Sequence, residues 1–220
     1  MASCLYSNGS ILLTGGCIYS SYKSSASRNS YLLEIRNNIV QCKQFKPMLV
    51  RRFSHGSVVI KDTAYVFGGH DGTETLSSME YYDNIEEKWK FLQFMNIERE
   101  IFAFCGFRER YIFVFGGFNV NHLDTIERYD VISDTWKLMG IKMKRPMQNP
   151  TAVELDYDRV ALIGGYNGAL HKCIDILDVN KKTWTSIENM QVPRRRAHCY
   201  LYDNKVCLNN KSYFIIYLFN

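Results

Sequence analysis

Two short markers recur along this chain of 220 residues with a common period. Gly-Gly pairs begin at positions 15, 68, 116 and 164, so successive pairs lie 53, 48 and 48 residues apart. Tryptophans stand at 89, 136 and 184, each 20 or 21 residues after the first glycine of its own pair. Because independent markers seldom share a period by chance, the chain is built from repeats, each of them one supersecondary unit.

Each repeat predicts four short strands. An apolar run precedes each glycine pair, and a second run ends in an aspartate six residues before each tryptophan, at Asp83, Asp130 and Asp178. For the second repeat the strands are expected near 54–60, 63–68, 76–82 and 87–92, with Gly, Asp or Asn at the turns. No long window has the apolar spacing of a helix. The first repeat has an additional serine-rich stretch at 20–30, which predicts an enlarged surface loop.

Gly-Gly, Tyr-Asp and Trp at these offsets resemble the kelch family, whose repeat is about 50 residues long. The resemblance covers residues 1–208 and implies an all-β kelch β-propeller with one four-stranded blade per repeat. Four blades are expected at about 1–48, 49–95, 96–143 and 144–190, and a degenerate partial fifth at 191–208. Residues 209–220 remain outside the repeats as an apolar tail, because Asn209-Asn210 replaces the glycine pair. Within the family, the chain is most similar in style to kelch-like (BTB-kelch) adaptors, which select substrates for cullin-type ubiquitin ligases.

The number of repeats is low for a propeller of this family, which usually has five to seven blades. An open arc of blades would leave strand edges and apolar faces in water, where they promote self-association. Three explanations are open: a fragment of a longer protein, an unusually small closed propeller, or completion by another chain. We expect a fragment, with self-association through the open blade edges as a consequence.

Charge and cysteine content narrow the classes of function. The net charge is +5, and the short basic runs at 51–52 and 194–196 are far apart, whereas nucleic-acid-binding surfaces usually concentrate their basic residues. We therefore expect no nucleic-acid partner. The seven cysteines contain no Cys-x-x-Cys pair and no zinc-ligand spacing, so we expect free thiols, no metal and no cofactor.

The sequence also bears on location. The N-terminus has no basic segment followed by an apolar core, which a secretory signal would have. The most apolar run, at 213–219, is too short to cross a bilayer. An odd number of cysteines without a signal is typical of a reducing compartment. A cytoplasmic protein with no membrane partner is the expectation.

The repeated residues themselves have structural explanations. Glycine pairs let the chain bend where a Cβ atom would clash, and none has the Lys-Ser/Thr that follows in a phosphate-binding loop. The tryptophans are suited to the gap between blades, where the indole N–H still finds an acceptor. The three aspartates are expected to accept backbone N–H groups in turns. Cys42 occupies the tryptophan position of the first repeat, so this blade is expected to pack more loosely.

Two sets of residues are candidates for binding a partner. The first set follows a repeated methionine by four residues, and it consists of Arg52, Arg99 and Arg194, with Met147 interrupting the series. The family resemblance implies that these arginines line the mouth of the propeller, where a guanidinium would bind carboxylates of an acidic peptide. The alternative is an arginine packed along the blade loops. The second set lies in the loops after the glycine pairs and consists of His70, Asp71, Asn119, His122, Asn167 and His171, with Tyr166 next to Asn167.

These features predict a non-catalytic module that binds a protein or peptide partner. His122 and His171 occupy comparable positions in successive repeats, but no third ligand predicts a metal site. No Gly-x-Ser-x-Gly, His-Glu-x-x-His or convergent carboxylates indicate an enzyme. The alternatives are an actin-associated or cytoskeletal scaffold, and a truncated gene product without independent function.

Overall fold

The computed structural model describes residues 1–19, 24–37, 39–202, 205–209 and 213–217. The chain divides into two compact units, one formed by Met1–Ile101 with Ile132–Trp136 and the other by Phe102–Val131 with Lys137–Asn220. The described residues are almost entirely β-strands, and their one helix is the 3-10 turn η1 (Ser7–Gly9). Within these ranges no helix is long and apolar enough to span a membrane.

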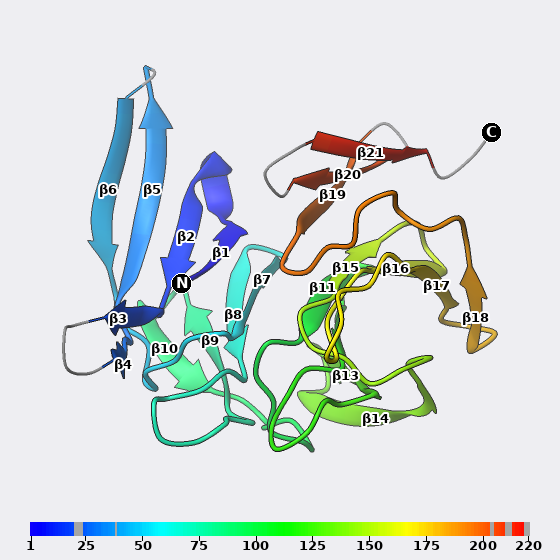
Figure 1. The fold of residues 1–220 in the computed structure, drawn as a ribbon. Helices are drawn as coiled ribbons and strands as arrows, with labels where there is room; N and C mark the ends of the chain where they lie inside the picture. Colours follow the sequence, from blue (N-terminus) through cyan, green and yellow to red (C-terminus); the bar gives the residue numbers. More distant parts are fainter. Residues whose placement is uncertain (20–23, 38, 203–204, 210–212, 218–220) are drawn as a thin grey trace. The chain divides into compact units, whose positions relative to one another are not determined.

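The first two four-stranded sheets belong to the first unit (Figure 1). The first, in the order β1-β2-β5-β6, contains β1 (Ala2–Leu5), β2 (Ile11–Thr14), β5 (Ser30–Arg36) and β6 (Ile39–Phe45). The second, in the order β10-β9-β8-β7, contains β7 (Gly56–Ile60), β8 (Thr63–Phe67), β9 (Met79–Asp83) and β10 (Lys88–Phe91). The first and last residues of these four strands differ from those predicted for the second repeat by three residues at most.

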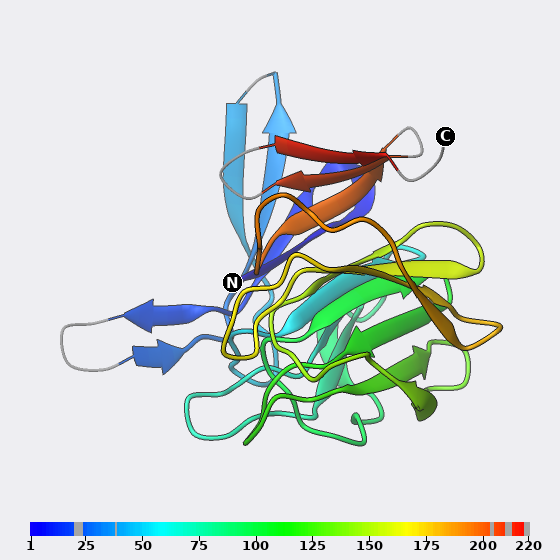
Figure 2. The ribbon, with the colours of Figure 1, turned by 45° about the vertical axis from the view of Figure 1, so that its right-hand side comes forward.

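The serine-rich stretch of the first repeat contributes to a hairpin of its own. Strand β3 (Cys17–Tyr19) pairs with β4 (Ser24–Ala26), and the hairpin projects away from the first sheet (Figure 2). The predicted surface loop is thus partly ordered as strands, while residues 20–23 lie outside the described ranges.

Two further four-stranded sheets and one three-stranded sheet follow along the chain. The third contains β11 (Ala103–Phe107), β12 (Tyr111–Phe115), β13 (Thr125–Asp130) and β14 (Thr135–Lys142), in that order. The fourth contains β15 (Thr151–Glu154), β16 (Arg159–Ile163), β17 (Ile174–Asp178) and β18 (Thr183–Ser186), also in sequence order. The last contains β19 (His198–Tyr202), β20 (Lys205–Asn209) and β21 (Tyr213–Tyr217), the final strand coming from the predicted tail.

The four four-stranded sheets are the blades of a β-propeller, so the predicted all-β propeller fold is confirmed. Consecutive blades of one unit contact each other through their first strands. Strand β1 lies beside β7 in the first unit, and β11 lies beside β15, which lies beside β19, in the second. Each repeat therefore buries its apolar face against a neighbouring repeat, as repeat architectures require.

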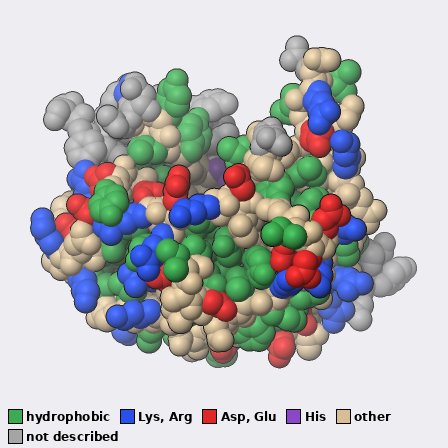
Figure 3. Space-filling view, turned by 180° about the vertical axis from the view of Figure 1, so that it is seen from behind, with side chains coloured by type: hydrophobic (Ala, Val, Ile, Leu, Met, Phe, Trp, Pro, Cys, Tyr) green, Lys and Arg blue, Asp and Glu red, His purple; other side chains and the backbone are tan. Residues whose placement is uncertain are grey.

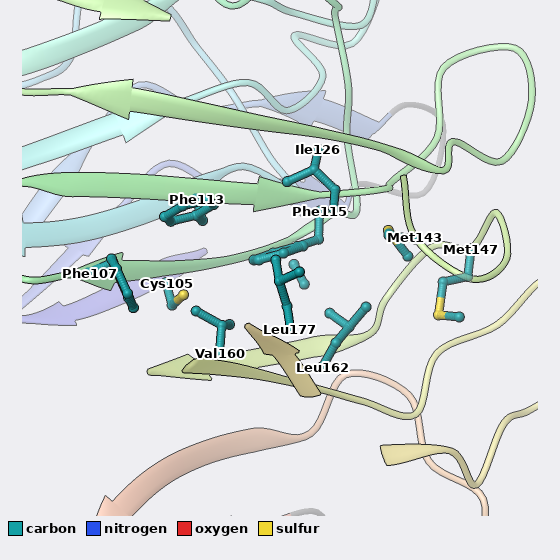
Figure 4. Close-up of a cluster of buried hydrophobic side chains, with 11 residues drawn as sticks. Cys105, Phe107, Phe113, Phe115, Ile126, Met143, Met147, Val160, Leu162 and Leu177 are labelled. Atoms are coloured by element: carbon teal, nitrogen blue, oxygen red, sulfur yellow. The ribbon is translucent and has the colours of Figure 1, made fainter. Parts of the chain in front are cut away.

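Apolar side chains fill the space between neighbouring blades. In the second unit, Phe113 and Phe115 of the third blade face Val160, Leu162 and Leu177 of the fourth (Figure 4). In the first unit, an equivalent cluster joins the first two blades, and it consists of the buried residues Leu12, Met48, Ala64, Val66, Tyr82 and Trp89. Packing between blades thus explains the apolar run before each glycine pair, because β8, β12 and β16 are buried at successive residues and so on both faces.

The tryptophans occupy the predicted place at these junctions. The indole N–H of Trp89 donates to the carbonyl of Lys46 at 2.8 Å, at the end of the preceding repeat. Trp136 donates to Gln93 at 3.0 Å and Trp184 to Lys142 at 2.8 Å. The same bond therefore recurs between successive repeats, and Trp89 is the most buried of the three at 3% exposure.

Each glycine pair is held against one backbone carbonyl. The second glycine donates its N–H to the backbone carbonyl of the residue four positions after the repeated methionine. Gly165, for example, donates to the carbonyl of Arg194 at 2.9 Å. A Cβ atom added to Gly164 would lie 2.3 Å from the same carbonyl oxygen of Arg194. The other three repeats make the same N–H bond, from Gly16 to Arg52, Gly69 to Arg99 and Gly117 to Met147. The glycines thus permit a close backbone approach, as their sequence pattern predicts.

Three glycine-to-alanine substitutions separate the causes of this requirement. Gly164 has a φ of +67° and a clashing Cβ position, Gly168 has a φ of +105° with nothing within 4 Å, and Gly140 has neither constraint. We expect Gly164→Ala to lower the free energy of unfolding by about 2 kcal/mol or more, Gly168→Ala by about 1, and Gly140→Ala by about zero. Urea unfolding measures all three, and equal effects would contradict the steric explanation.

Two of the three predicted turn acceptors, Asp83 and Asp178, bond backbone N–H groups. Oδ1 of Asp83 accepts the backbone N–H groups of Ile85 at 2.9 Å and Glu86 at 3.0 Å, and Oδ1 of Asp178 accepts that of Lys181 at 2.7 Å. The Lys90 ammonium, together with these N–H groups, lowers the pKa of Asp83 to about 2. Asp130 binds the Arg110 guanidinium through both carboxylate oxygens, at 3.0 and 2.7 Å.

The first blade lacks the tryptophan contact because Cys42 stands in its place. Cys42 is exposed on β6, and every residue of this strand except Phe45 is exposed. Ile35 on β5 and Val40 on β6 remain 65% and 62% exposed. The outer strands β14 and β18, which keep their tryptophans, are largely exposed as well, so the looser packing of the first blade stays a prediction.

Candidate functional site

The arginine series lies in the interior of the blades. Arg52 has no exposed area, and its guanidinium donates to the carbonyl of Gly68 at 2.7 Å and to Glu80 at 2.7 Å. Glu80, also fully buried, accepts the backbone N–H groups of Leu49 at 2.6 Å and Val50 at 3.0 Å. The Arg52 side chain is thereby directed into the blade, because it satisfies a buried carboxylate and carbonyls that have no access to water.

Arg99 has no exposed area either, and Arg194 is half-buried. Of the two expectations raised for this series, a guanidinium lining the propeller mouth does not describe Arg52 or Arg99 in the structure. The second expectation was an arginine packed along the blade loops. It describes Arg52, whose guanidinium is paired with the buried Glu80 inside the protein.

The fourth blade shows how one member of the series was replaced. Met147 is buried at the arginine position, and the acid at the position of Glu80 is the shorter Asp175. Lys144 lies 3.4 Å and Arg145 3.8 Å from the Asp175 carboxylate, and the Ser186 hydroxyl donates to it at 2.5 Å. The buried negative charge thus keeps cationic partners although the arginine is absent.

In the first unit, the loop after the second glycine pair is shaped by its own predicted binding residues. Oδ1 of Asp71 accepts the N–H groups of Thr73 at 2.6 Å and Glu74 at 2.8 Å, and these bonds, the one from Glu74 first, lower the pKa of Asp71. His70 accepts the N–H of Gly72 at Nδ1, 2.9 Å away, and its ring lies 5.3 Å from that of Phe53. Both residues are half-exposed, so they are accessible at the surface while fixing the loop.

In the second unit, the loops of the third and fourth blades meet. The His122 ring lies 5.5 Å from Phe118 and 6.2 Å from Tyr166 of the next repeat. The Arg195 guanidinium lies 5.1 Å from the Tyr166 ring centroid, in cation–π contact. These four residues form a continuous row, which we call the Tyr166 row, from the third and fourth blades to the segment before β19.

The remaining loop candidates of the second unit stabilise the loops next to the Tyr166 row. Asn119 accepts the backbone N–H of Val120 at 2.6 Å. His171 bonds Asn167 at 2.6 Å, and Asn167 donates to the carbonyl of Pro146 at 3.2 Å. Burial and the nearby Arg145 lower the pKa of His171, which favours its neutral form. His122 approaches Tyr166, and within the described ranges no group of three or more His, Cys, Asp or Glu residues has the geometry of a metal site.

Charged side chains of both signs are interspersed on the face shown in Figure 3. Arg51, next to Arg52, is exposed, and so are Arg195 and Arg196, which follow Arg194. All seven cysteines are free thiols, and burial raises the pKa of Cys199 to about 12, which keeps it protonated.

Comparison with known proteins gives the same repeat. Residues 1–152 match the family model described as the KLHDC2/KLHL20/DRC7 Kelch-repeats domain. The chain belongs to the kelch-repeat family. The predicted family and its resemblance to BTB-kelch proteins are thereby confirmed.

Several curated kelch proteins are similar to the chain. Human Kelch-like protein 38 is 31% identical over 168 residues, which cover 75% of this chain and 28% of that protein. The Caenorhabditis elegans Kelch repeat-containing protein kel-10 is 27% identical over 72% of this chain and 28% of its own length. Kelch repeat and BTB domain-containing protein 2 of cowpox virus (strain GRI-90 / Grishak) is 27% identical over 59% of this chain and 26% of its own length. The kelch chain thus spans about a quarter of the length of these relatives.

Sequence reasoning did not select two members of the Tyr166 row as binding residues. Phe118 directly follows a glycine pair, and Arg195 follows the arginine position of the kelch repeat. A usable signal was present, because a residue next to an internal repeat position on an extended segment points elsewhere. The repeat phase alone does not show which of two adjacent arginines is directed inward.

Proposed function

We propose that this kelch chain is a non-catalytic module that binds a protein or peptide partner through the loops that follow its glycine pairs. The observation that carries the proposal is the Tyr166 row, in which half-exposed rings join the loops of two neighbouring blades and the exposed Arg195 contacts them from the segment before β19. Val120 and Leu170 at the tips of the same loops are 81% and 46% exposed. Aromatic rings and an arginine among exposed apolar side chains are the composition of binding hot spots.

The chemistry of this surface favours a partner with an acidic group. Arg195 is exposed and stacked on a ring, which fixes its planar fork for bidentate binding of a carboxylate. Arg51 offers a second exposed cation, in the loop region of the first unit. We further propose an adaptor role of the kind found in substrate-recognition subunits of ubiquitin ligases, supported by the two-domain names of BTB-containing relatives. The seven free thiols support a location in the cytoplasm.

Self-association is proposed as a second property of the chain. Register pairing places Leu5, Ile11, Leu33, Ile35 and Val40 on one face of the first sheet, and Leu5 is 69% exposed. The charged residues Glu34, Arg36 and Lys43 of this sheet lie on its opposite face. An exposed apolar sheet face without charge favours association, which sedimentation at several protein concentrations would detect.

The binding proposal is tested by charge reversal on a captured partner. The full chain is used to capture partners, and the affinity of each purified partner is then measured for Arg195→Glu, Tyr166→Ala and Lys181→Glu. We expect Arg195→Glu and Tyr166→Ala each to weaken binding by about tenfold or more, as for a hot-spot residue. Lys181, 78% exposed in the turn before β18, is the control and should have no effect. Equal effects of all three variants would refute a loop-centred binding surface.

A further inference from the structure

A cavity of about 270 Å³ lies within the second unit, away from the loop surface. Its walls come from the β11–β12 turn, from β12, β13 and β14 of the third blade, and from the turn between β17 and β18 of the fourth. Strand β12 runs from the turn at Arg108 to the Gly116-Gly117 loop, so the cavity and the loop surface lie toward opposite ends of the blade. This volume suits a ligand smaller than a typical drug-sized molecule.

The cavity wall has a marked charge. It includes the four cations Arg108, Arg128, Lys137 and Lys182 and no carboxylate. Arg108 is neutralised nearby, because it lies 3.0 Å from Asp158. Within the described ranges, the other three cations have no carboxylate within ion-pair distance. Like charges gathered without counter-charges repel one another, and a bound anion would relieve this repulsion.

The same positions in the neighbouring repeat show that the fold does not require these cations. Counted from the tryptophans and the turns, the second repeat and the following turn carry Lys61, Tyr81, Lys90 and Asp134 at the equivalent places. Only two of these are cations, and one is an acid. Residues common to all repeats build blades, whereas a cluster confined to one junction indicates a local function.

The lysine that follows the tryptophan is paired with carboxylates in the second blade but not in the third. In the second blade, Lys90 binds Asp83 at 2.8 Å and also binds Glu86. In the third blade, the equivalent Asp130 is occupied by Arg110, and a serine, Ser133, stands at the position of Glu86. Lys137 therefore has neither of the partners that neutralise its counterpart.

The chemistry of a ligand that fits this cavity follows from an unsatisfied hydrogen-bond donor of Arg128 and from the apolar part of the wall. The Nε of Arg128 is buried and has no acceptor among the described residues, and its guanidinium lies 4.3 Å from the Tyr111 ring centroid. A buried donor without an acceptor costs free energy that an anionic oxygen would recover. Phe107, Met139 and Val179 form an apolar part of the cavity wall.

We propose that this cavity binds a phosphate monoester of a small organic group. Arg128, Lys137 and Lys182 provide donors for the phosphoryl oxygens, and the apolar wall contacts the organic group. Three cations match the two negative charges and three acceptor oxygens of such a phosphate. The site is independent of the proposed partner-binding loops, which lie at the other end of the blade.

Calorimetric titration of the full chain with phenyl phosphate tests the proposal. We expect saturable binding that is tighter than for inorganic phosphate, because only the ester has an apolar part, and that weakens as salt is added. Lys137→Gln should weaken binding roughly tenfold through loss of one charge-assisted hydrogen bond. Lys181→Gln, in the same turn as Lys182 but paired with Asp178, is the matched control and should not change it.

A second pair of variants tests the cavity without removing a cation. A side chain at Gly140 enters open space, since nothing lies within 4 Å of its Cβ position. Gly140→Glu should abolish phenyl phosphate binding, and Gly140→Gln should retain most of it. A phosphotyrosine peptide identifies the source: binding that depends on Lys137 indicates a modified protein, and binding of phenyl phosphate alone indicates a free metabolite. Failure of both ligands to saturate, or equal losses in Lys137→Gln and Lys181→Gln, would overturn the proposal.

Discussion

Replacing Arg52 with alanine is expected to lower the free energy of unfolding by about 3–5 kcal/mol, the cost of leaving a buried charge without its partner. Glu80 would stay fully buried with only the backbone N–H groups of Leu49 and Val50 as donors. The carbonyls of Gly68 and Ser78 would lose the guanidinium as well. Urea unfolding followed by tryptophan fluorescence measures the change.

The adjacent arginine is the matched control for this prediction. Arg51 is exposed, so Arg51→Ala should change the free energy of unfolding by less than about 0.5 kcal/mol. The double variant Arg52→Met/Glu80→Leu should lose less than Arg52→Ala, because no buried charge remains. Similar losses for Arg51→Ala and Arg52→Ala would show that the buried ion pair does not stabilise the blade.

Replacing Trp89 with alanine is the second substitution with a large expected effect. Trp89 is 3% exposed, its ring centroid lies 5.5 Å from that of Tyr82, and its N–H bonds Lys46 of the preceding repeat. The cavity left behind should lower the free energy of unfolding by about 3–5 kcal/mol. Trp184→Ala should cost less, because Trp184 is half-exposed, although it makes the same kind of bond.

Urea unfolding measures Trp89→Ala and Trp184→Ala, and a third variant, Trp89→Phe, separates the contribution of the indole N–H from that of the buried ring. Trp89→Phe keeps most of the buried area and loses the indole N–H, so it should cost about 1–2 kcal/mol. If Trp184→Ala destabilises as much as Trp89→Ala, burial between blades does not explain the tryptophan pattern.

The repeat pattern predicted the fold well because its markers report backbone requirements. The glycine pairs had to be small because a Cβ atom at Gly164 would meet the carbonyl of Arg194, and any sequence with this fold has the same restriction. The tryptophans and the aspartates Asp83 and Asp178 were also placed correctly, because each of them bonds a backbone group that recurs with the repeat. The hairpin of β3 and β4 was not predicted, since a serine-rich stretch has little apolar alternation to indicate strands.

The site was harder to predict because the arginine series has a second explanation. The backbone carbonyl at this position binds a glycine N–H in every repeat, so the position persists even where the side chain is Met147. The sequence therefore showed a conserved phase among the repeats without showing where the side chain points. Only the three-dimensional arrangement shows that Arg52 is directed inward and that Arg195 lies against Tyr166.

Hydrogen–deuterium exchange of the full chain with a captured partner tests the central claim, that repeat-specific loop residues bind and repeat-wide residues build the blades. We expect partner-induced protection in the loops at 118–123 and 166–171 and around Arg195. The turns at 108–110 and 178–182, toward the opposite ends of the third and fourth blades, should exchange as in the free protein. Protection confined to those turns, with the loops unchanged, would contradict the account.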